Sequence, residues 1–211
     1  MTERERFIAA LERKPITGRV PHFELVFFLT MEALGKVHPE HRRYGQWKQM
    51  TETEKELIRR DQADCYIDVA EKYHHSAMLV HAPDDNTFEE RIKFYNTIRE
   101  KSGDKYFVMI TKDPTYSIPS GDRMVDFSAE CAEEPEKVKK RAQESVDRHI
   151  REAEALAKYP GLVDGIAMCS DYCFNTNPFF SPAMFSEFVT PYLAQIIKAY
   201  RELGFYTIKH T

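Results

Sequence analysis

The chain has 211 residues, of which 42% are hydrophobic and 30% are charged, and its formal net charge is −4. These values indicate a globular domain and exclude a disordered chain. The sequence has no basic cluster and no apolar run longer than residues 25–29, so we expect neither a nucleic-acid nor a membrane partner. Four cysteines are too few for a disulfide scaffold, so we expect a reduced, cytoplasmic protein.

The first half of the chain is predicted to alternate helices and strands after an opening helix. Thr2 and Glu5 form the Thr-x-x-Glu pattern of a helix capping box, and Thr51 and Glu54 repeat it. Runs of β-branched and aromatic residues predict strands. In chain order we expect helix 2–14, strand 20–29, a loop with at most a short helix over 30–50, helix 51–63, a second helical piece over 67–73, strand 76–81, helix 88–101 and strand 105–111.

The second half continues the alternation with two long polar connections. Pro135 fits the first turn of a helix, and Ser181 followed by Pro182 reads as an N-cap and first turn. Pro191 lies inside the helix that follows, so we expect a kink there. In chain order we expect an irregular stretch over 113–133, helix 135–157, strand 161–168, a loop over 170–180, helix 182–203 and strand 205–209.

Alternating strands and helices predict a parallel sheet covered by helices, which is the α/β class. Five strands would suit either a doubly wound sheet or five-eighths of a (β/α)8 barrel of the TIM type. Neither a G-x-G-x-x-G nor a G-x-x-x-x-G-K-[ST] motif is present, which favours the barrel. Because only His210 and Thr211 follow the fifth strand, we expect residues 1–211 to be a single incomplete barrel domain, truncated after that strand, with its β/α units starting near residue 20.

Residues that follow parallel strands meet at one edge of a sheet, where barrel enzymes place their chemistry. Asp84 and Asp85 could instead cap a helix, and His22 could be a core histidine; for His81 and His210 we favour a functional role. The candidate site residues, in chain order, are His22, Glu24, His81, Asp84, Asp85, Asp113, Asp171, Tyr172, Asn175, Asn177 and His210.

Several stretches together resemble the uroporphyrinogen decarboxylase-like family, which includes corrinoid-dependent methyltransferases. They are ERFIAAL at 5–11 with RVP at 19–21, DGI at 164–166 with SDY at 170–172, and SPAMF at 181–185 with FVTPY at 188–192, followed by Gly204 and His210. The resemblance covers nearly the whole chain, and it implies a (β/α)8 barrel of well over 300 residues.

Within this family the resemblance favours the methyltransferase branch. True decarboxylases carry an arginine-rich stretch after the first strand, whereas residues 23–29 contain no arginine. The methyltransferase branch has a zinc-binding histidine at the end of strand five, which His210 matches. The resemblance therefore implies transfer of a methyl group between a corrinoid and a small-molecule or thiol acceptor, with His210, Asp171 and His81 around the substrate, zinc on His210 and a corrinoid protein as partner.

Two alternatives stay open. One is decarboxylation of uroporphyrinogen in porphyrin biosynthesis, which needs no cofactor. The other is an inactive, truncated chain that self-associates into a homo-oligomer through exposed strand edges.

Overall fold

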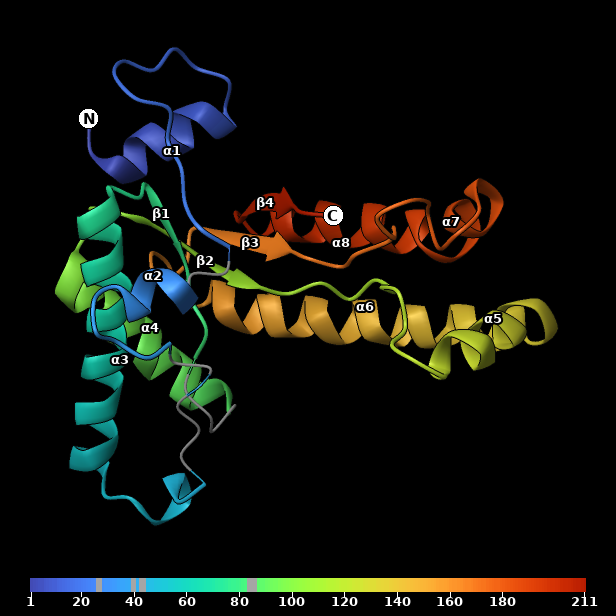
Figure 1. Ribbon diagram of the computed structural model, residues 1–211, viewed down its shortest axis with the longest axis horizontal. Coiled ribbons are helices and arrows are strands. Elements are labelled where there is room, and N and C mark those ends of the chain that lie inside the picture. Colours follow the sequence, from blue (N-terminus) through green and yellow to red (C-terminus); the bar gives the residue numbers. More distant parts are fainter. Residues whose placement is uncertain (26–27, 39–40, 42–44, 83–86) are drawn as a thin grey trace. The chain divides into compact units, whose positions relative to one another are not determined.

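The computed structural model describes residues 1–25, 28–38, 41, 45–82 and 87–211. Its strands form a four-stranded parallel sheet in the order β1-β2-β3-β4 (Figure 1), so the predicted α/β class is confirmed. The strands are β1 (Ala77–Leu79), β2 (Phe107–Thr111), β3 (Gly165–Met168) and β4 (Tyr206–Lys209). The chain divides into two compact units, Met1–Ile110 with Gly161–Gly165 and Thr111–Pro160 with Ile166–Thr211, and each is described by itself below.

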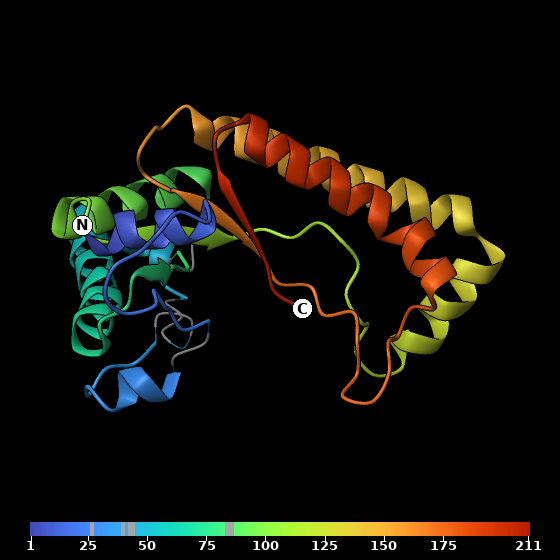
Figure 2. The ribbon, with the colours of Figure 1, turned by 90° about the horizontal axis from the view of Figure 1, so that it is seen from above.

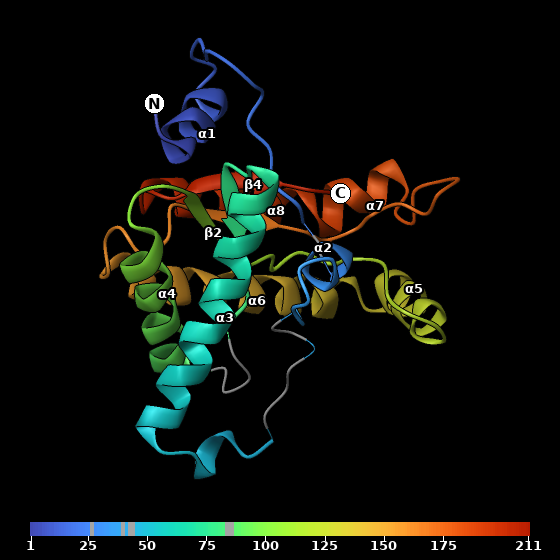
Figure 3. The same cartoon turned by 60° about the vertical axis from the view of Figure 1, so that its left-hand side comes forward.

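The first unit is built mainly on two long helices, α3 (Glu52–Tyr73) and α4 (Phe88–Ser102), which pack against each other, as Figure 3 shows. Both predicted capping boxes are present, at Thr2 and at Thr51. The predicted gap between helical pieces at 64–66 is wrong, because Cys65 and Tyr66 are buried and continue the helix. The helical elements are α1 (Glu3–Leu11), α2 (Phe28–Glu32), the 3-10 turn η2 (Trp47–Gln49), α3 (Glu52–Tyr73) and α4 (Phe88–Ser102).

The predicted first strand, 20–29, is wrong in the residues described. Residues 20–25 have no strand structure, and helix α2 begins at Phe28; residues 26 and 27 lie outside the described part. The Ser76 backbone N–H donates to the His22 carbonyl at 2.8 Å. This bond alone does not make a ladder, and β-branched and aromatic residues form a strand only where a neighbouring strand pairs with them.

A buried carboxylate ties helices of the first unit to the sheet. Asp164 Oδ1 accepts hydrogen bonds from Arg4 Nε at 3.0 Å and Nη2 at 2.8 Å. Asp164 Oδ2 accepts from Arg99 Nη2 at 2.6 Å and from the Val108 backbone N–H at 2.9 Å. The Asp164 side chain is 3% exposed, so it connects α1 and α4 to β2 through charge-assisted hydrogen bonds shielded from water.

The second unit pairs two long helices, α6 (Pro135–Ala157) and α8 (Thr190–Glu202), which lie side by side in Figure 2. Helix α5 (Arg123–Glu133) packs on α6, and α7 (Pro182–Phe188) packs on α8. Buried residues of α5, α6 and α7, together with residues from the connections beside α7, form a common apolar cluster of Phe127, Cys131, Val138, Tyr172, Phe180, Phe188 and Val189.

The irregular stretch predicted over 113–133 is wrong in its second half, where α5 forms. Phe127 and Cys131 are four residues apart on this helix, and both are buried in the apolar cluster. Tertiary packing of one helix face therefore stabilises a helix that directly follows Pro114, Pro119 and Gly121, which suggested a loop.

The proline in the last helical region ends one helix and begins the next. Helix α7 ends at Phe188, Val189 has φ −119°, and α8 begins at Thr190 with Pro191 in its first turn. A first-turn proline lacks an N–H that would have no helical partner anyway, so the break costs little hydrogen bonding. The predicted kink is thus a complete interruption, while α4, α6 and β4 match their predicted positions within a few residues.

Candidate functional site

Polar residues from three strand ends meet in the second unit. Asp113 and Thr115 follow β2, Ser170 and Tyr172 follow β3, and Lys209 is the last residue of β4. We call these five residues the strand-end cluster. The carboxyl ends of parallel strands are where α/β enzymes place reacting groups, and this position makes the cluster the candidate site.

Asp113 is the centre of the strand-end cluster. Its Oδ1 accepts from the Thr115 backbone N–H at 3.0 Å and from the Thr115 hydroxyl at 2.5 Å. Its Oδ2 accepts from the Ser170 backbone N–H at 2.9 Å and from Lys209 Nζ at 3.1 Å. Burial raises the pKa of Asp113, but these hydrogen bonds and the Lys209 charge outweigh burial and hold the pKa below its usual value.

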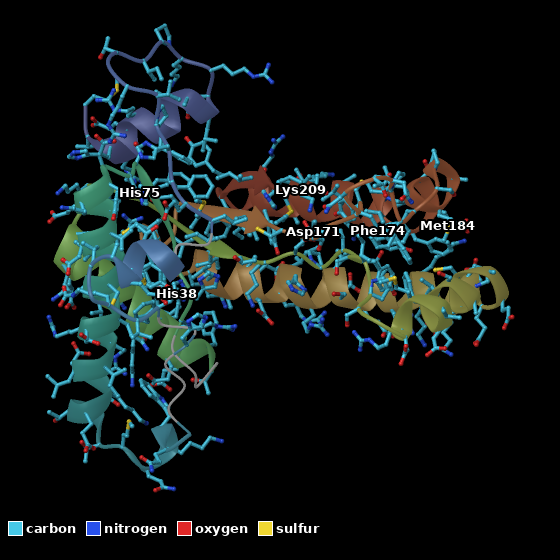
Figure 4. All side chains as sticks on the ribbon, viewed as in Figure 1. His38, His75, Asp171, Phe174, Met184 and Lys209 are labelled. Carbon is cyan, nitrogen blue, oxygen red and sulfur yellow. The ribbon has the colours of Figure 1, made fainter. Side chains whose placement is uncertain are left out.

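Lys209 Nζ makes three hydrogen bonds, which is as many as an ammonium group has hydrogens to donate. Besides Asp113, Nζ donates to the carbonyls of Ser170 at 2.8 Å and His210 at 2.9 Å. Nζ also lies 4.4 Å from the centroid of the Tyr172 ring, which is a cation–π contact. The hydrogen bonds of Lys209 therefore join the segments that follow β2, β3 and β4. The side chain of Lys209 is labelled in Figure 4.

Tyr172 closes the cluster on its apolar side. Its hydroxyl lies 2.7 Å from the Thr115 hydroxyl, and burial raises the pKa of Tyr172 to about 12. Its ring packs edge-on against Phe185 at 5.1 Å between centroids. The phenol stays protonated at neutral pH, so it can take part in hydrogen bonds but is no base.

The other predicted residues of the second unit are exposed. The His210 backbone N–H donates to the Met168 carbonyl at 2.9 Å, and its ring makes no hydrogen bond with any residue the structure describes. The Asp171 carbonyl accepts from the Ile118 N–H at 2.9 Å, while its side chain is exposed (Figure 4). Asn175 and Asn177 are exposed in the loop between β3 and α7, where Asn177 Nδ2 donates to the Pro178 carbonyl at 3.2 Å.

Three of the predicted residues that the structure describes belong to the first unit. His22 Nδ1 lies 2.9 Å from Arg19 Nη1, and its Nε2 lies 3.2 Å from the Tyr73 carbonyl. Glu24 accepts from the Thr30 hydroxyl at 2.6 Å.

The His81 backbone N–H donates to the Tyr66 hydroxyl at 3.0 Å, and its ring centroid lies 5.8 Å from that of buried His38. Asp84 and Asp85 lie outside the described residues. The site roles of these five first-unit residues therefore stay predictions from the sequence.

Sequence reasoning missed Thr115 and Lys209 as site residues, whereas Ser170 is one of the residues that follow a predicted strand. A lysine at the end of an apolar strand was available as a signal, since Lys209 directly precedes His210. Its role depends on Asp113, which is 96 residues away in sequence. Such a pairing is visible only once the strands are placed in order.

A zinc ion on His210 would need further ligands. Catalytic zinc sites use three protein ligands, and no group of three His, Cys, Asp or Glu side chains among the described residues could hold a metal. The exposed ring of His210 can serve as one ligand, but the described residues do not complete the site. No reaction step is therefore derived through a metal.

Comparisons with known proteins leave the family open. No protein-family model matches the sequence, and no curated protein matches it. Within the described residues, no helix has both the length and the apolar character needed to span a bilayer.

Proposed function

We propose that this protein is an enzyme of the uroporphyrinogen decarboxylase-like family, built on a (β/α)8 barrel, that moves a methyl group between a corrinoid and a small-molecule or thiol acceptor. The strand-end cluster carries the proposal. It gathers a carboxylate, an ammonium group and hydroxyls at the carboxyl ends of β2, β3 and β4, where barrel enzymes bind and convert substrates.

The charges of the strand-end cluster favour methyl transfer over decarboxylation. The cation in it, Lys209, is already bound by Asp113 and two carbonyl groups. A tetrapyrrole with several carboxylates needs several free cations, preferably arginines. The cluster offers no such group, whereas a small, weakly charged methyl donor or a thiol needs none.

The residues of the chain have distinct roles in this proposal. Asp113 and Lys209 hold the three strand ends in a fixed arrangement, and His210 and Asp171 present exposed groups beside it. When bound, the corrinoid supplies or receives the methyl group. An acceptor thiol must lose its proton as the sulfur–carbon bond forms, and the Asp171 carboxylate or the His210 ring is available to accept that proton.

The test is methyl transfer from methylcobalamin to a panel of thiols, followed by the cobalamin absorbance and by mass spectrometry of the methylated thiol. We expect transfer by the unaltered protein and a loss of at least about tenfold in the His210→Asn variant. His74→Asn is the matched control, because His74 is also exposed and its left-handed backbone, φ +57°, tolerates asparagine.

Two results would reject the proposal. One is the absence of methyl transfer to every acceptor together with an absence of zinc uptake. The other is release of carbon dioxide from an acidic pyrrole substrate, which would identify the decarboxylase instead. Equal losses in the two histidine variants would remove His210 from the mechanism.

A further inference from the structure

A pocket of about 590 Å³ opens in the second unit between the segment after β2 and helix α5. The segment 115–120 forms one wall, one face of α5 forms another, and Arg141 of α6 closes the side. Its volume lies within the roughly 300–1,000 Å³ range of pockets that bind small molecules. No residue of the proposed methyl-transfer mechanism except Thr115, through its bond to Asp113, touches this pocket.

One pair of charges in the lining is already satisfied. Arg141 binds Glu130 through two parallel hydrogen bonds, Nη1 to Oε1 at 2.8 Å and Nη2 to Oε2 at 2.6 Å. The Arg141 guanidinium also lies 6.0 Å from the centroid of the Tyr116 ring. A hydrogen bond from Arg141 holds the pKa of Glu130 below its usual value, so this pair stays ionised. The two side chains line the pocket as an ion pair whose charges are already paired with each other.

A second pair of opposite charges is unused. Arg123 and Asp126 are exposed lining residues one turn apart on α5, and neither makes an ion pair with any residue that the structure describes. Side chains three positions apart on a helix lie on neighbouring parts of its surface. Among the described residues that line the pocket, Arg123 and Asp126 are therefore a cation and an anion without an ion-pair partner, on neighbouring parts of α5.

Besides the hydroxyl residues Thr115, Ser117 and Ser120, the remaining lining is apolar and aromatic. The rings of Tyr116 and Phe127 lie 4.9 Å apart between centroids, and Ile118 and Pro119 extend this surface. An aromatic or aliphatic body of a ligand can pack here, because flat apolar surfaces stack on rings and exclude water.

We infer that this pocket binds a small zwitterion with an apolar body, of the chemical class of an aromatic amino acid. Its carboxylate faces Arg123, its ammonium group faces Asp126, and its body lies against Tyr116 and Ile118. A simple anion would leave Asp126 facing a like charge, and a simple cation would face Arg123, so each binds less well than a molecule with both charges. The inference does not depend on methyl transfer.

The experiment compares three molecules with the same phenyl body, titrated into the protein by saturation-transfer NMR. They are phenylalanine, 3-phenylpropionate, which lacks the ammonium group, and 2-phenylethylamine, which lacks the carboxylate. We expect phenylalanine to bind roughly three- to tenfold more tightly than either analogue, as expected for exposed ion pairs.

Variants assign the charges. Arg123→Gln should lower phenylalanine affinity to about that of 2-phenylethylamine, and Asp126→Asn should lower it to about that of 3-phenylpropionate, while Arg123→Lys should keep most of the binding. Arg151→Gln and Glu154→Gln are matched controls on the exposed face of α6 and should change nothing. Because all four positions are exposed, unchanged thermal melting is expected throughout.

Three results would overturn the inference. One is the absence of saturable binding by any of the three molecules. The second is binding of 3-phenylpropionate as tightly as phenylalanine, which would mean a simple anion site. The third is an equal loss of affinity in the α6 control variants, which would show that binding follows overall charge and not the pocket.

Discussion

The buried carboxylate of Asp113 accepts four hydrogen bonds from donors on three segments of the chain. Two come from Thr115, one from the Ser170 backbone and one from Lys209. Its side chain is 5% exposed, and that of Lys209 is 20% exposed. In such surroundings the loss of one partner leaves the other charge without compensation, which destabilises more than the pair itself stabilises.

We expect Asp113→Asn to lower the free energy of unfolding by about 2–3 kcal/mol, because Lys209 then keeps a partly buried charge without its counterion. Urea unfolding followed by circular dichroism measures this change. Asp171→Asn is the control, since Asp171 is exposed, and it should change stability by less than about 0.5 kcal/mol. Equal stability of the two variants would contradict the structural role of Asp113.

The same residue predicts a pH dependence. The pKa of Asp113 is lower in the folded protein than in the unfolded chain, so its stabilising effect is complete above the unfolded value of about 4 and is lost as pH falls through the folded value. The unaltered protein should therefore lose stability below pH 4 more steeply than Asp113→Asn does.

At the scale of the element, segments with several agreeing signals were predicted well. Helix α4 has an N-cap at Thr87 and glycine at its end, and α6 has Pro135 in its first turn, so propensity, capping and periodicity agreed. Helix α5 and the segment 20–25 were predicted wrongly because their structure depends on contacts distant in sequence. The apolar cluster around Phe127 stabilises α5, whereas the segment 20–25 has no paired strand among the described residues.

The candidate site divides in the same way. Asp113 and Tyr172 were found because position after a strand is readable from sequence, whereas Lys209 acts through a partner on another strand. The sequence analysis names Asp164 only within the DGI stretch of the family resemblance and predicts no ion pair for it. Its ion pairs with Arg4 and Arg99 join residues separated by 160 and 65 positions, and no local pattern reveals them.

We expect Asp164→Asn to destabilise the first unit by about 3 kcal/mol, because two arginines lose a carboxylate that is 3% exposed. Amides of α1 should exchange with solvent faster, since Arg4 holds this helix. Asp104→Asn, an exposed position in the same unit, is the control and should leave exchange unchanged. If α1 exchanges at the same rate in both variants, Asp164 does not anchor it.

At the scale of the whole molecule, β4 comes last in the order of the sheet. The residues of β4 are neither fully buried nor fully exposed, and in the described part of the chain β4 has β3 as its neighbour in the sheet. An unpaired strand edge offers backbone N–H and C=O groups to another chain. This geometry supports the expectation that the protein self-associates.

We expect the 211-residue protein to form oligomers in a concentration-dependent way through β4, and Thr207→Pro to reduce this association. The His210 N–H points to β3, and alternation along a parallel strand turns the Thr207 N–H to the other side, so proline removes an outward donor without removing a bond to β3. Thr207→Ala keeps that donor while also removing the threonine hydroxyl that Arg201 contacts, which makes it the matched control. Sedimentation velocity over a range of concentrations measures the result, and a single monomeric species with cooperative melting at all concentrations would contradict it.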